Sequence, residues 1–338
     1  MVAELHSLMG AFPYQREVER YTPMSRPLRM KPYLEERFEY EFFHIRPSIH
    51  INYYLDYSTT FLKLGLILSR GRYDGLLTWN HYYVPLLLPF RTRSKVLVDI
   101  TDVERSITHN RLLKGMLVDL VEGVMDRIDL LISADYGHYQ RLAPSTGGRV
   151  EYVPNGVDVE AFKPDPGAEK RYDVCYLGKV ERQYRLEPVI EAISAASARA
   201  LFVGSGSDME YYRRYAKQRG AEITFAGAVP YAEVPGLLNS CRMGIVPPVE
   251  SASLKLLEYL ACGLPVASPG VLDPAVDEVV LHIRSGAAEE YRRAIEGVIS
   301  MGEGEYRSVS RRCRQSALGF SIKEIGKRYC DVIEEVLG

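Results

Sequence analysis

Short apolar runs rich in β-branched and aromatic residues alternate with stretches of helical periodicity along the second half of the chain. We predict five strands there, namely Tyr172–Leu177, Arg199–Val203, Glu222–Ala226, Met243–Val246 and Leu264–Ala267. The stretches between them, residues 186–198, 208–219, 231–239 and 253–262, are predicted helices. Strands that alternate with helices over short connections form a parallel sheet covered on both faces. The pattern therefore predicts an α/β domain with a doubly wound sheet.

The first half of the chain repeats this alternation from residue 73 onward. Its predicted strands are residues 73–79, 95–100, 128–133 and 149–153, and a long helix with an apolar stripe is predicted at 103–126. Residues 1–50 are rich in Tyr, Phe, Arg and Pro and show no clear periodicity. The last stretch, residues 322–337, is a predicted helix that we expect to cross back to the first domain.

A domain boundary is predicted near residues 154–167. The Asn155-Gly156 pair is a turn signal, and Lys163-Pro164-Asp165-Pro166-Gly167 interrupts any regular element soon after it. We therefore expect two Rossmann-like, doubly wound domains that face each other across a cleft. The predicted division is 1–156 and 157–321, with 322–338 returning to the first.

The composition excludes several classes of protein. The 338 residues are 46% apolar and 25% charged, as in soluble globular proteins, and 42 basic against 44 acidic residues leave a net charge of −2. This balance provides no positive excess that would attract nucleic acid. The five cysteines form no C-x2-C pair, which indicates free thiols in a reducing compartment. We find no secretory signal and no apolar run of about 18 residues, so the expectation is a cytoplasmic protein.

Candidate chemistry follows the first predicted strand of the second domain. Gly178 and Lys179 end that strand, and Arg185 lies six residues later, near the start of a helix. Two cations beside a helix N-terminus would suit a diphosphate; a solvated polar loop is the alternative. After the next strand, Gly204-Ser205-Gly206 lacks the third glycine of a dinucleotide fingerprint because Met209 occupies that position. A tight strand-to-helix turn is the alternative there.

The third candidate segment consists of a loop with Glu250 and a predicted helix with Glu258. Ser253 is a suitable N-cap, which would leave the backbone N–H groups of Leu254 and Lys255 open to a ligand. Glu258 follows on a segment that is otherwise apolar. A buried carboxylate is costly without a partner, so we expect either sugar hydroxyls or a salt bridge at Glu258.

The order of these features resembles the nucleotide-binding half of GT-B glycosyltransferases, and most of all the retaining family-4 (group 1) enzymes. The motifs that carry the resemblance are Gly178-Lys179…Arg185, Val203-Gly204-x-Gly206, Ala226-Gly227-x-Val229 and Glu250-x7-Glu258 with Gly263-x-Pro265-Val266. Val153-Pro154-Asn155-Gly156-Val157-Asp158 resembles the interdomain signature of the same family. The resemblance extends from about residue 95 to the end of the chain and is nearly absent before residue 70.

The resemblance implies a nucleotide-sugar donor held mainly by the second domain and an acceptor held by the first. Lys179 and Arg185 match the basic pair on the donor diphosphate, in the reverse of the usual order. Glu258 matches the glutamate on the ribose hydroxyls, and Glu250 the one near the donor sugar. Further donor contacts are implied at Gly178, Gly204, Val229, Pro230, Ser253, Leu254 and Lys255.

The chain departs from the family pattern in three places. Ser251-Ala252-Ser253 replaces the usual aromatic or glycine followed by glycine. Thr101 replaces a histidine of the first domain, whereas Asp102 keeps the neighbouring acid and is our remaining catalytic candidate there. The N-terminal glycine-rich loop is not recognisable, and Gly10 is its nearest equivalent. Other candidate acceptor contacts are Asn80, His81 and Asp99.

These features predict a retaining glycosyltransferase that moves a hexose from a nucleoside-diphosphate sugar to an acceptor hydroxyl. We predict no metal site and no required cofactor, because the two cations would neutralise the diphosphate. The acceptor is a glycan, a lipid-linked molecule or a small molecule. Basic residues beside the apolar run 86–90 would suit peripheral contact with the inner face of a membrane. The alternatives are a sugar-nucleotide epimerase on the same scaffold and a non-catalytic sugar-nucleotide-binding protein; a nicotinamide dehydrogenase fits less well.

Overall fold

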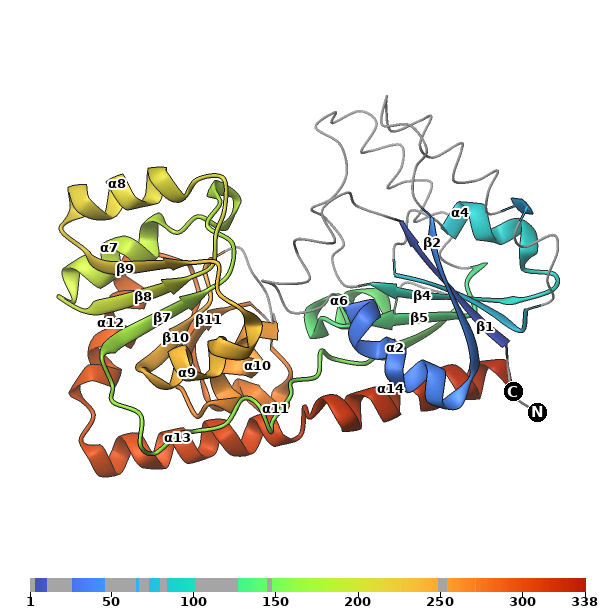
Figure 1. Cartoon of the computed structure of the whole chain (residues 1–338). Coiled ribbons are helices and arrows are strands. Elements are labelled where there is room, and N and C mark those ends of the chain that lie inside the picture. The colour runs from blue at the N-terminus through green and yellow to red at the C-terminus, as the bar shows by residue number, and fades with distance from the viewer. Residues whose placement is uncertain are drawn as a thin grey trace. The chain divides into compact units, whose positions relative to one another are not determined.

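The computed structural model describes residues 4–10, 26–45, 65–66, 73–79, 84–100, 127–144, 148–248, 254–270 and 272–338. The described chain divides into two compact units (Figure 1). The first contains the described residues up to Pro154 together with Gly326–Gly338, and the second contains Asn155–Ile325. Within these described ranges, none of the helices combines the length and the apolarity that a membrane-spanning helix requires.

The described strands of the first unit form a six-stranded parallel sheet with the order β2-β1-β3-β4-β5-β6. Their bounds are Glu4–Gly10 (β1), Glu39–Ile45 (β2), Gly75–Thr78 (β3), Lys95–Ile100 (β4), Leu130–Ser133 (β5) and Arg149–Tyr152 (β6). Its helices are α2 (Arg26–Arg37), α4 (Val84–Leu87), the 3-10 turn η2 (Leu88–Phe90), α6 (Tyr136–Leu142) and the later part of α14 (Ile322–Leu337).

The second unit also has a six-stranded parallel sheet, with the order β12-β11-β10-β7-β8-β9. The strands are Tyr172–Leu177 (β7), Arg199–Val203 (β8), Glu222–Gly227 (β9), Cys241–Ile245 (β10), Val266–Pro269 (β11) and Val280–Ile283 (β12). Renumbered from its first strand, this is the Rossmann order 3-2-1-4-5-6 read from the other end. The strand order therefore reverses between β7 and β10.

Helices cover both faces of this second sheet. They are α7 (Glu187–Ala195), α8 (Met209–Arg219), α9 (Val234–Asn239), α10 (Leu254–Ala261), α11 (Pro274–Asp277), α12 (Ala288–Ser300) and α13 (Glu303–Leu318), with 3-10 turns η4 (Arg182–Tyr184) and η5 (Tyr231–Glu233). One apolar cluster joins the sheet to α7, α8 and α12, and the other joins it to α9, α10 and α13. Figure 1 shows α7 and α8 on one side of the sheet and α13 on the other.

The predicted strands of the second unit are confirmed in place, with ends that differ by up to two residues. The prediction missed β12 and α11–α13, and it found no element in residues 1–50, where the structure has β1, α2 and β2. Pro27 and Pro32 lie inside α2 and disturb its apolar repeat. The predicted long helix 103–126 lies outside the described residues.

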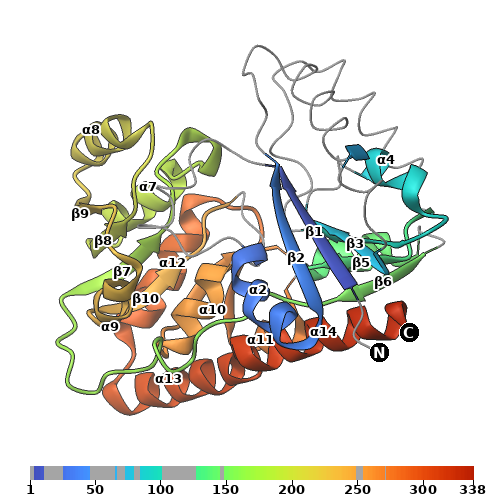
Figure 2. The same ribbon diagram turned by 45° about the vertical axis from the view of Figure 1, so that its right-hand side comes forward.

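In the first unit, α2 packs against the last turns of α14 (Figure 2). A Cβ at Gly326 would lie 2.4 Å from the ring of Tyr33, so this close approach requires glycine. Arg37, at the end of α2, pairs with Asp331 and with Glu334. The C-terminal helix is thus bound to the first unit by both shape and charge.

One buried guanidinium ties four segments of the first unit together. Arg26 Nε donates to Asp99 Oδ2 on β4 at 2.7 Å, and its Nη atoms donate to the carbonyls of Val153 and Pro154 at 2.7 and 2.8 Å. The same group lies 5.3 Å from the ring centre of Tyr329 on α14. Arg26 therefore holds the chain just before it leaves the first unit, and also contacts the helix that returns to it.

Because Asp99 is fully buried beside a buried arginine, its loss leaves an uncompensated charge in the core. We expect Asp99→Ala to lower the free energy of unfolding by about 3–5 kcal/mol. The exposed pair Lys31–Glu35 gives the control, because Glu35→Ala should cost less than about 1 kcal/mol. Urea denaturation measures both variants, and an equally small effect in the two would contradict the buried ion pair.

Candidate functional site

The reversal of strand order between β7 and β10 marks the candidate site. In open parallel sheets, ligands bind beyond the carboxyl ends of the strands where the order reverses. Here that place lies just after Leu177 and Ile245, and α10 is the helix that follows β10. The second unit therefore has a ligand-binding position that follows from its topology alone.

The turns that leave β7, β8 and β9 are joined by backbone hydrogen bonds. Gly178 N–H donates to Val203 at 2.9 Å, and Gly204 N–H donates to Gly227 at 2.8 Å. Gly178 and Gly204 have φ values of +150° and +134°, and a Cβ at Gly204 would lie 1.9 Å from the carbonyl oxygen of Gly178. The glycines after β8 thus allow the turns to touch, as in the tight-turn alternative. A nucleotide contact at Gly204 stays a prediction.

The two predicted diphosphate cations lie on the exposed loop after β7. Among the described residues, no carboxylate pairs with Lys179 or Arg185. Arg182, between them, is already engaged: it stacks over Tyr211 at 4.0 Å, and its Nε lies 3.5 Å from Asp208. Lys179 and Arg185 are therefore exposed on this loop, whereas Arg182 is held by α8 and the turn before it.

Arg185 is held in a left-handed conformation, with φ of 50° and ψ of 60°. This conformation costs a non-glycine residue roughly 1–2 kcal/mol. It ends η4 and precedes α7, whose first residues include a proline. Strain of this kind at a charged, exposed residue is typical of functional positions.

Helix α10 is fixed to the end of β7. The hydroxyl of Tyr259 accepts a hydrogen bond from Leu177 N–H at 2.6 Å, and the Tyr259 ring packs on Gly244 of β10, where a Cβ would lie 2.4 Å away. Leu254 and Lys255 form the first turn of this helix. The Lys255 ammonium lies 4.9 Å from the ring centre of Tyr176 and 5.8 Å from that of Tyr184.

Glu258 is buried in α10, with 1% of its surface exposed. Its Oε1 accepts a hydrogen bond from the hydroxyl of Tyr231 at 2.5 Å, and Tyr231 packs against the buried ring of Phe162. A tyrosine hydroxyl is therefore one partner of this carboxylate, and the sequence did not predict it. A ribose contact at Glu258 stays a prediction.

Two predicted donor contacts lie between β9 and Tyr231. Val229 packs partly buried against the core, and the carbonyl of Pro230 accepts from Glu233 N–H at 2.9 Å at the start of η5. This segment leads from the end of β9 to the tyrosine that holds Glu258.

The remaining predicted site residues belong to the first unit or lie outside the described residues. Gly10 is the last residue of β1. Asp99 is fully buried and paired with Arg26, and an acceptor contact there stays a prediction. The remaining predictions lie outside the described residues: Glu250, Asp102, Ser253, Asn80 and His81.

Sequence reasoning missed the tyrosines that organise the site. Tyr176 donates its hydroxyl to the carbonyl of Lys179 at 2.6 Å, Tyr231 holds Glu258, and Tyr259 ties α10 to β7. The feature of the sequence that could have indicated them is a tyrosine placed inside an apolar strand or beside a buried glutamate. A polar ring tip at such a position requires a partner.

Three of the buried cysteines are unsuited to nucleophilic chemistry. All five are free and buried, as predicted. Burial, together with the nearby charge of Glu258, raises the pKa of Cys262 to about 12. Burial likewise raises the pKa of Cys313 and Cys330 to about 12. These three thiols therefore stay protonated at neutral pH.

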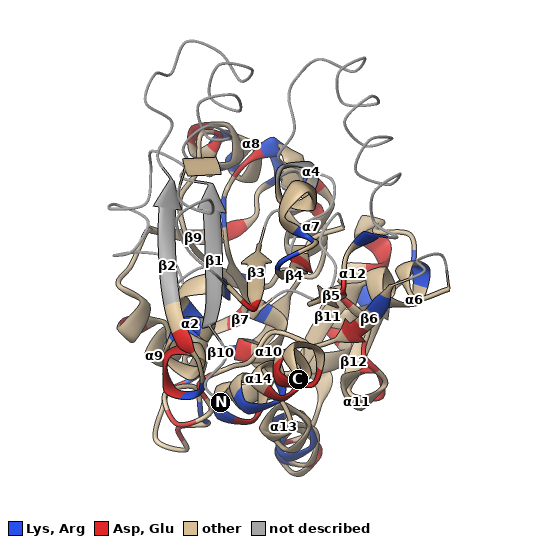
Figure 3. Cartoon of the chain, turned by 90° about the vertical axis from the view of Figure 1, so that its right-hand side faces the viewer, with Lys and Arg blue, Asp and Glu red and all other residues tan. Residues whose placement is uncertain are grey.

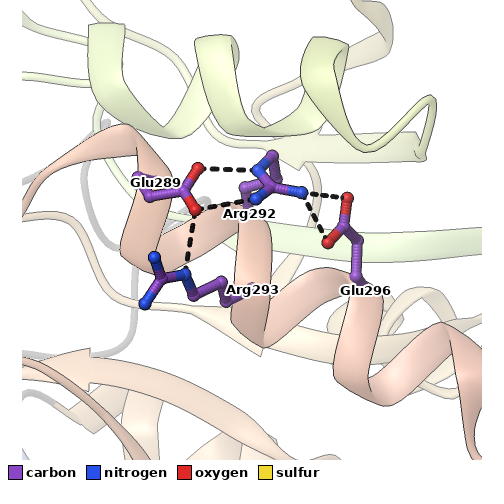
Figure 4. Close-up of polar contacts among 4 residues, drawn as sticks. All are labelled: Glu289, Arg292, Arg293 and Glu296. Atoms are coloured by element: carbon purple, nitrogen blue, oxygen red, sulfur yellow. Dashed lines mark hydrogen bonds and ion pairs between the residues drawn. The ribbon is translucent and has the colours of Figure 1, made fainter.

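Some basic residues elsewhere on the second unit are paired with acids. Figure 3 shows both signs of charge interspersed on α13. On α12, Arg292 and Arg293 bind Glu289, and Arg292 also binds Glu296 (Figure 4). Hydrogen bonds from the two arginines lower the pKa of Glu289 to about 2. This pairing contrasts with the loop after β7.

A surface hollow of about 430 Å³ lies away from the candidate site. It is lined by residues of α8 and the edge strand β9, including Arg213, Lys217 and Phe225. None of the predicted site residues lines it. Topology and charge, rather than this hollow, therefore locate the candidate site.

Residues 158–316 match the family described as glycosyl transferases group 1. The matched segment lies within the second unit. The chain is also 27% identical to a GDP-mannose-dependent α-(1-6)-phosphatidylinositol monomannoside mannosyltransferase of Mycobacterium tuberculosis, over 55% of this chain and 56% of the relative. The chain thus spans about half the length of the curated relatives that it matches.

Solved structures with the same fold include two that cover nearly the whole chain. Sucrose-phosphate synthase from Thermosynechococcus elongatus aligns with a TM-score of 0.80 and 12% identity, over 99% of both chains. HepE from Anabaena, in complex with UDP and glucose, aligns with a TM-score of 0.73 and 14% identity, over 98% of this chain and 100% of that one. The predicted α/β fold of the GT-B glycosyltransferases is confirmed.

The strained conformation of Arg185 allows its charge to be tested separately from stability. Arg185→Gly relieves the backbone and removes the cation, so the free energy of unfolding should stay within about 1 kcal/mol of wild type. Affinity for a nucleoside diphosphate should fall about 10-fold or more. Ser197→Gly is the matched control, since Ser197 has φ of 49° and is also exposed.

Thermal denaturation and titration calorimetry measure both properties in both variants. Ser197→Gly should leave stability and affinity near wild type. If the two variants bind nucleoside diphosphates equally well, Arg185 is not a diphosphate ligand.

Proposed function

We propose that the protein transfers a hexose from a nucleoside-diphosphate sugar to an acceptor hydroxyl, with retention of configuration and without a metal ion at the diphosphate. The proposal is supported by two features at the switch point of the second unit: a loop whose Lys179 and Arg185 have no acidic partner among the described residues, and a helix with a buried glutamate. Cations suit a diphosphate, and a buried carboxylate suits ribose hydroxyls. The retaining family-4 pattern of the sequence supports the same assignment.

In this proposal, Glu258 binds the ribose of the donor. The hydroxyl of Tyr231 occupies Oε1 of Glu258 and fixes the rotation of the carboxylate. A carboxylate so oriented can accept hydrogen bonds from two neighbouring hydroxyl groups. Val229 and Pro230 precede Tyr231 in the chain and would lie near the base.

Lys179 and Arg185 bind the diphosphate and stabilise it as it leaves. In the proposed reaction, the acceptor oxygen forms a bond to the anomeric carbon as the bond from that carbon to the phosphate oxygen breaks. The acceptor attacks the face from which the diphosphate departs, and the acceptor proton passes to a diphosphate oxygen. Negative charge grows on the diphosphate in this step, so fixed cations lower the barrier by about 3 kcal/mol each.

The donor and acceptor are proposed by class. The relatives include a GDP-mannose-dependent enzyme and a protein solved with UDP and glucose, so UDP- and GDP-sugars are the first donors to test. A glycan, a lipid-linked molecule or a small molecule would be the acceptor. Asp102 and Glu250 are proposed to act at the sugar, as the family pattern implies.

Contact with the inner face of a membrane is proposed for the first unit. Arg91, Arg93 and Lys95 are exposed just after η2, whose Leu88 and Phe90 are partly exposed. A patch of this kind can bind anionic lipid. Cosedimentation should therefore require anionic vesicles, and equal binding to neutral vesicles or to none would contradict the contact.

The ribose assignment can be tested with two ligands and three proteins. The wild type should bind its nucleoside diphosphate about 10-fold or more tightly than the 2′-deoxy form. Glu258→Ala should bind both forms equally weakly, because it lacks the carboxylate that accepts from the ribose 2′-hydroxyl. Tyr231→Phe keeps the carboxylate but removes the hydroxyl that orients it. Its preference for the ribose form over the 2′-deoxy form should lie between those of the wild type and Glu258→Ala.

Titration calorimetry gives the six affinities, and donor turnover with an acceptor panel completes the test. Ribose discrimination that survives in Glu258→Ala would contradict the assignment. Tight donor binding without transfer or hydrolysis would instead favour the non-catalytic sugar-nucleotide-binding protein.

A further inference from the structure

Strand β9 forms one edge of the sheet of the second unit (Figure 1). Among the strands that the structure describes, only β8 pairs with it. Along an edge strand, every second residue points its backbone N–H and C=O groups outward, where they can pair with another strand. β9 contains no lysine or proline that would protect this edge, and its Ile223, Thr224 and Phe225 are residue types that favour strands. The outer side of β9 can therefore accept a further strand.

The hollow of about 430 Å³ lies along this edge. Its lining residues are Arg213, Ala216, Lys217, Ala221, Ile223 and Phe225. The residues from α8 are spaced as one face of a helix, and the other three alternate as one face of a strand. Every second side chain of a strand added beside β9 would point to the same side as Ile223 and Phe225, and so into the hollow.

The charge of the hollow indicates which side chains fit there. Arg213 and Lys217 are exposed, and the Arg213 guanidinium lies 5.8 Å from the ring centre of Phe225. In the described part of the chain, no acidic side chain forms an ion pair with either cation. Helix α8 as a whole has four basic residues and one acidic residue. An occupant with carboxylates beside the two cations and apolar side chains on Ile223 would thus be complementary to the hollow.

The spacing of the two cations matches the repeat of a strand. Arg213 and Lys217 are four residues apart, which is about 6 Å along a helix. Residues at alternate positions of a strand are roughly 6.6 Å apart. Two acidic residues at alternate positions of an added strand can therefore reach both cations at once, with apolar residues on either side of them.

We propose that β9 and α8 form a docking site for an extended acidic peptide of a partner protein, which pairs with the outer edge of β9 as a seventh strand of this sheet. The peptide backbone bonds to β9, and alternate side chains enter the hollow. Its carboxylates bind Arg213 and Lys217, and its apolar side chains pack on Ile223 and Phe225. None of the residues that line the hollow belongs to the candidate donor site, so the two kinds of binding can be measured separately.

A synthetic peptide with blocked ends tests the docking site. Its residues alternate between threonine and, in order, leucine, glutamate, glutamate and leucine. The wild type should bind it about 10-fold or more tightly than a peptide with lysine in place of both glutamates. The bound peptide should also slow hydrogen exchange of the backbone amides in residues 222–227, because a strand partner protects them. Fluorescence anisotropy at low, fixed ionic strength measures affinity, and mass spectrometry measures exchange.

Reversal of the two charges should reverse the preference. The double variant Arg213→Glu/Lys217→Glu should bind the glutamate peptide about 10-fold more weakly than the wild type and should prefer the lysine peptide. Arg214→Glu is the matched control, because Arg214 is an exposed arginine of α8 that does not line the hollow. It should keep the wild-type affinities. Thermal denaturation without peptide shows that each variant folds.

Three results would overturn the proposal. The first is a wild type that does not bind the glutamate peptide. The second is binding that leaves exchange in residues 222–227 unchanged, because the peptide would then not pair with β9. The third is an equal loss of affinity in Arg214→Glu, since the general positive charge of α8, and not the hollow, would then attract the peptide.

Discussion

The attachment of α10 to the end of β7 is the constraint on which the candidate site depends. Leu177 lies beyond the last paired residues of β7 and β10, and the hydroxyl of Tyr259 accepts a hydrogen bond from its N–H at 2.6 Å. The ring can reach this position only because residue 244 of β10 is a glycine. With α10 fixed in this way, Glu258 lies toward Tyr231 and Lys255 lies against Gly178. A larger residue at position 244 would displace both charged side chains at once.

Charged side chains of the second unit are paired on α12 but only in part on the loop after β7. On α12, arginines and glutamates form a network of surface ion pairs and neutralise each other's charge. On the loop after β7, Arg182 is engaged by Asp208 and Tyr211, whereas its neighbours Lys179 and Arg185 have no described acidic partner. In the proposed function, Lys179 and Arg185 are the two cations of this loop that bind the diphosphate. Fold and electrostatics thus point to the same end of the sheet.

The sequence predicted the strands β3–β6 of the first unit and most of the second unit, but no element in residues 1–50, for physical reasons. Strands such as β7 and β8 are continuous apolar runs bounded by glycine, and this pattern is typical of buried parallel strands. In residues 1–50, prolines inside α2 and the mixed polarity of β2 conceal both elements. Of the site, the basic loop and the buried glutamate could be read from residue types and spacing. The tyrosine contacts and the ion pair of Asp99 with Arg26 could not, because they join residues that are distant in the sequence.

A crystal structure with a bound nucleoside diphosphate would test the central claim most directly. The account predicts phosphate groups beyond the end of β7, within hydrogen-bond distance of Lys179 and Arg185, with the ribose hydroxyls on Glu258. A nucleotide bound elsewhere on the second unit, such as beside α8 and β9, would contradict it. So would a diphosphate bound at the switch point through groups other than these cations.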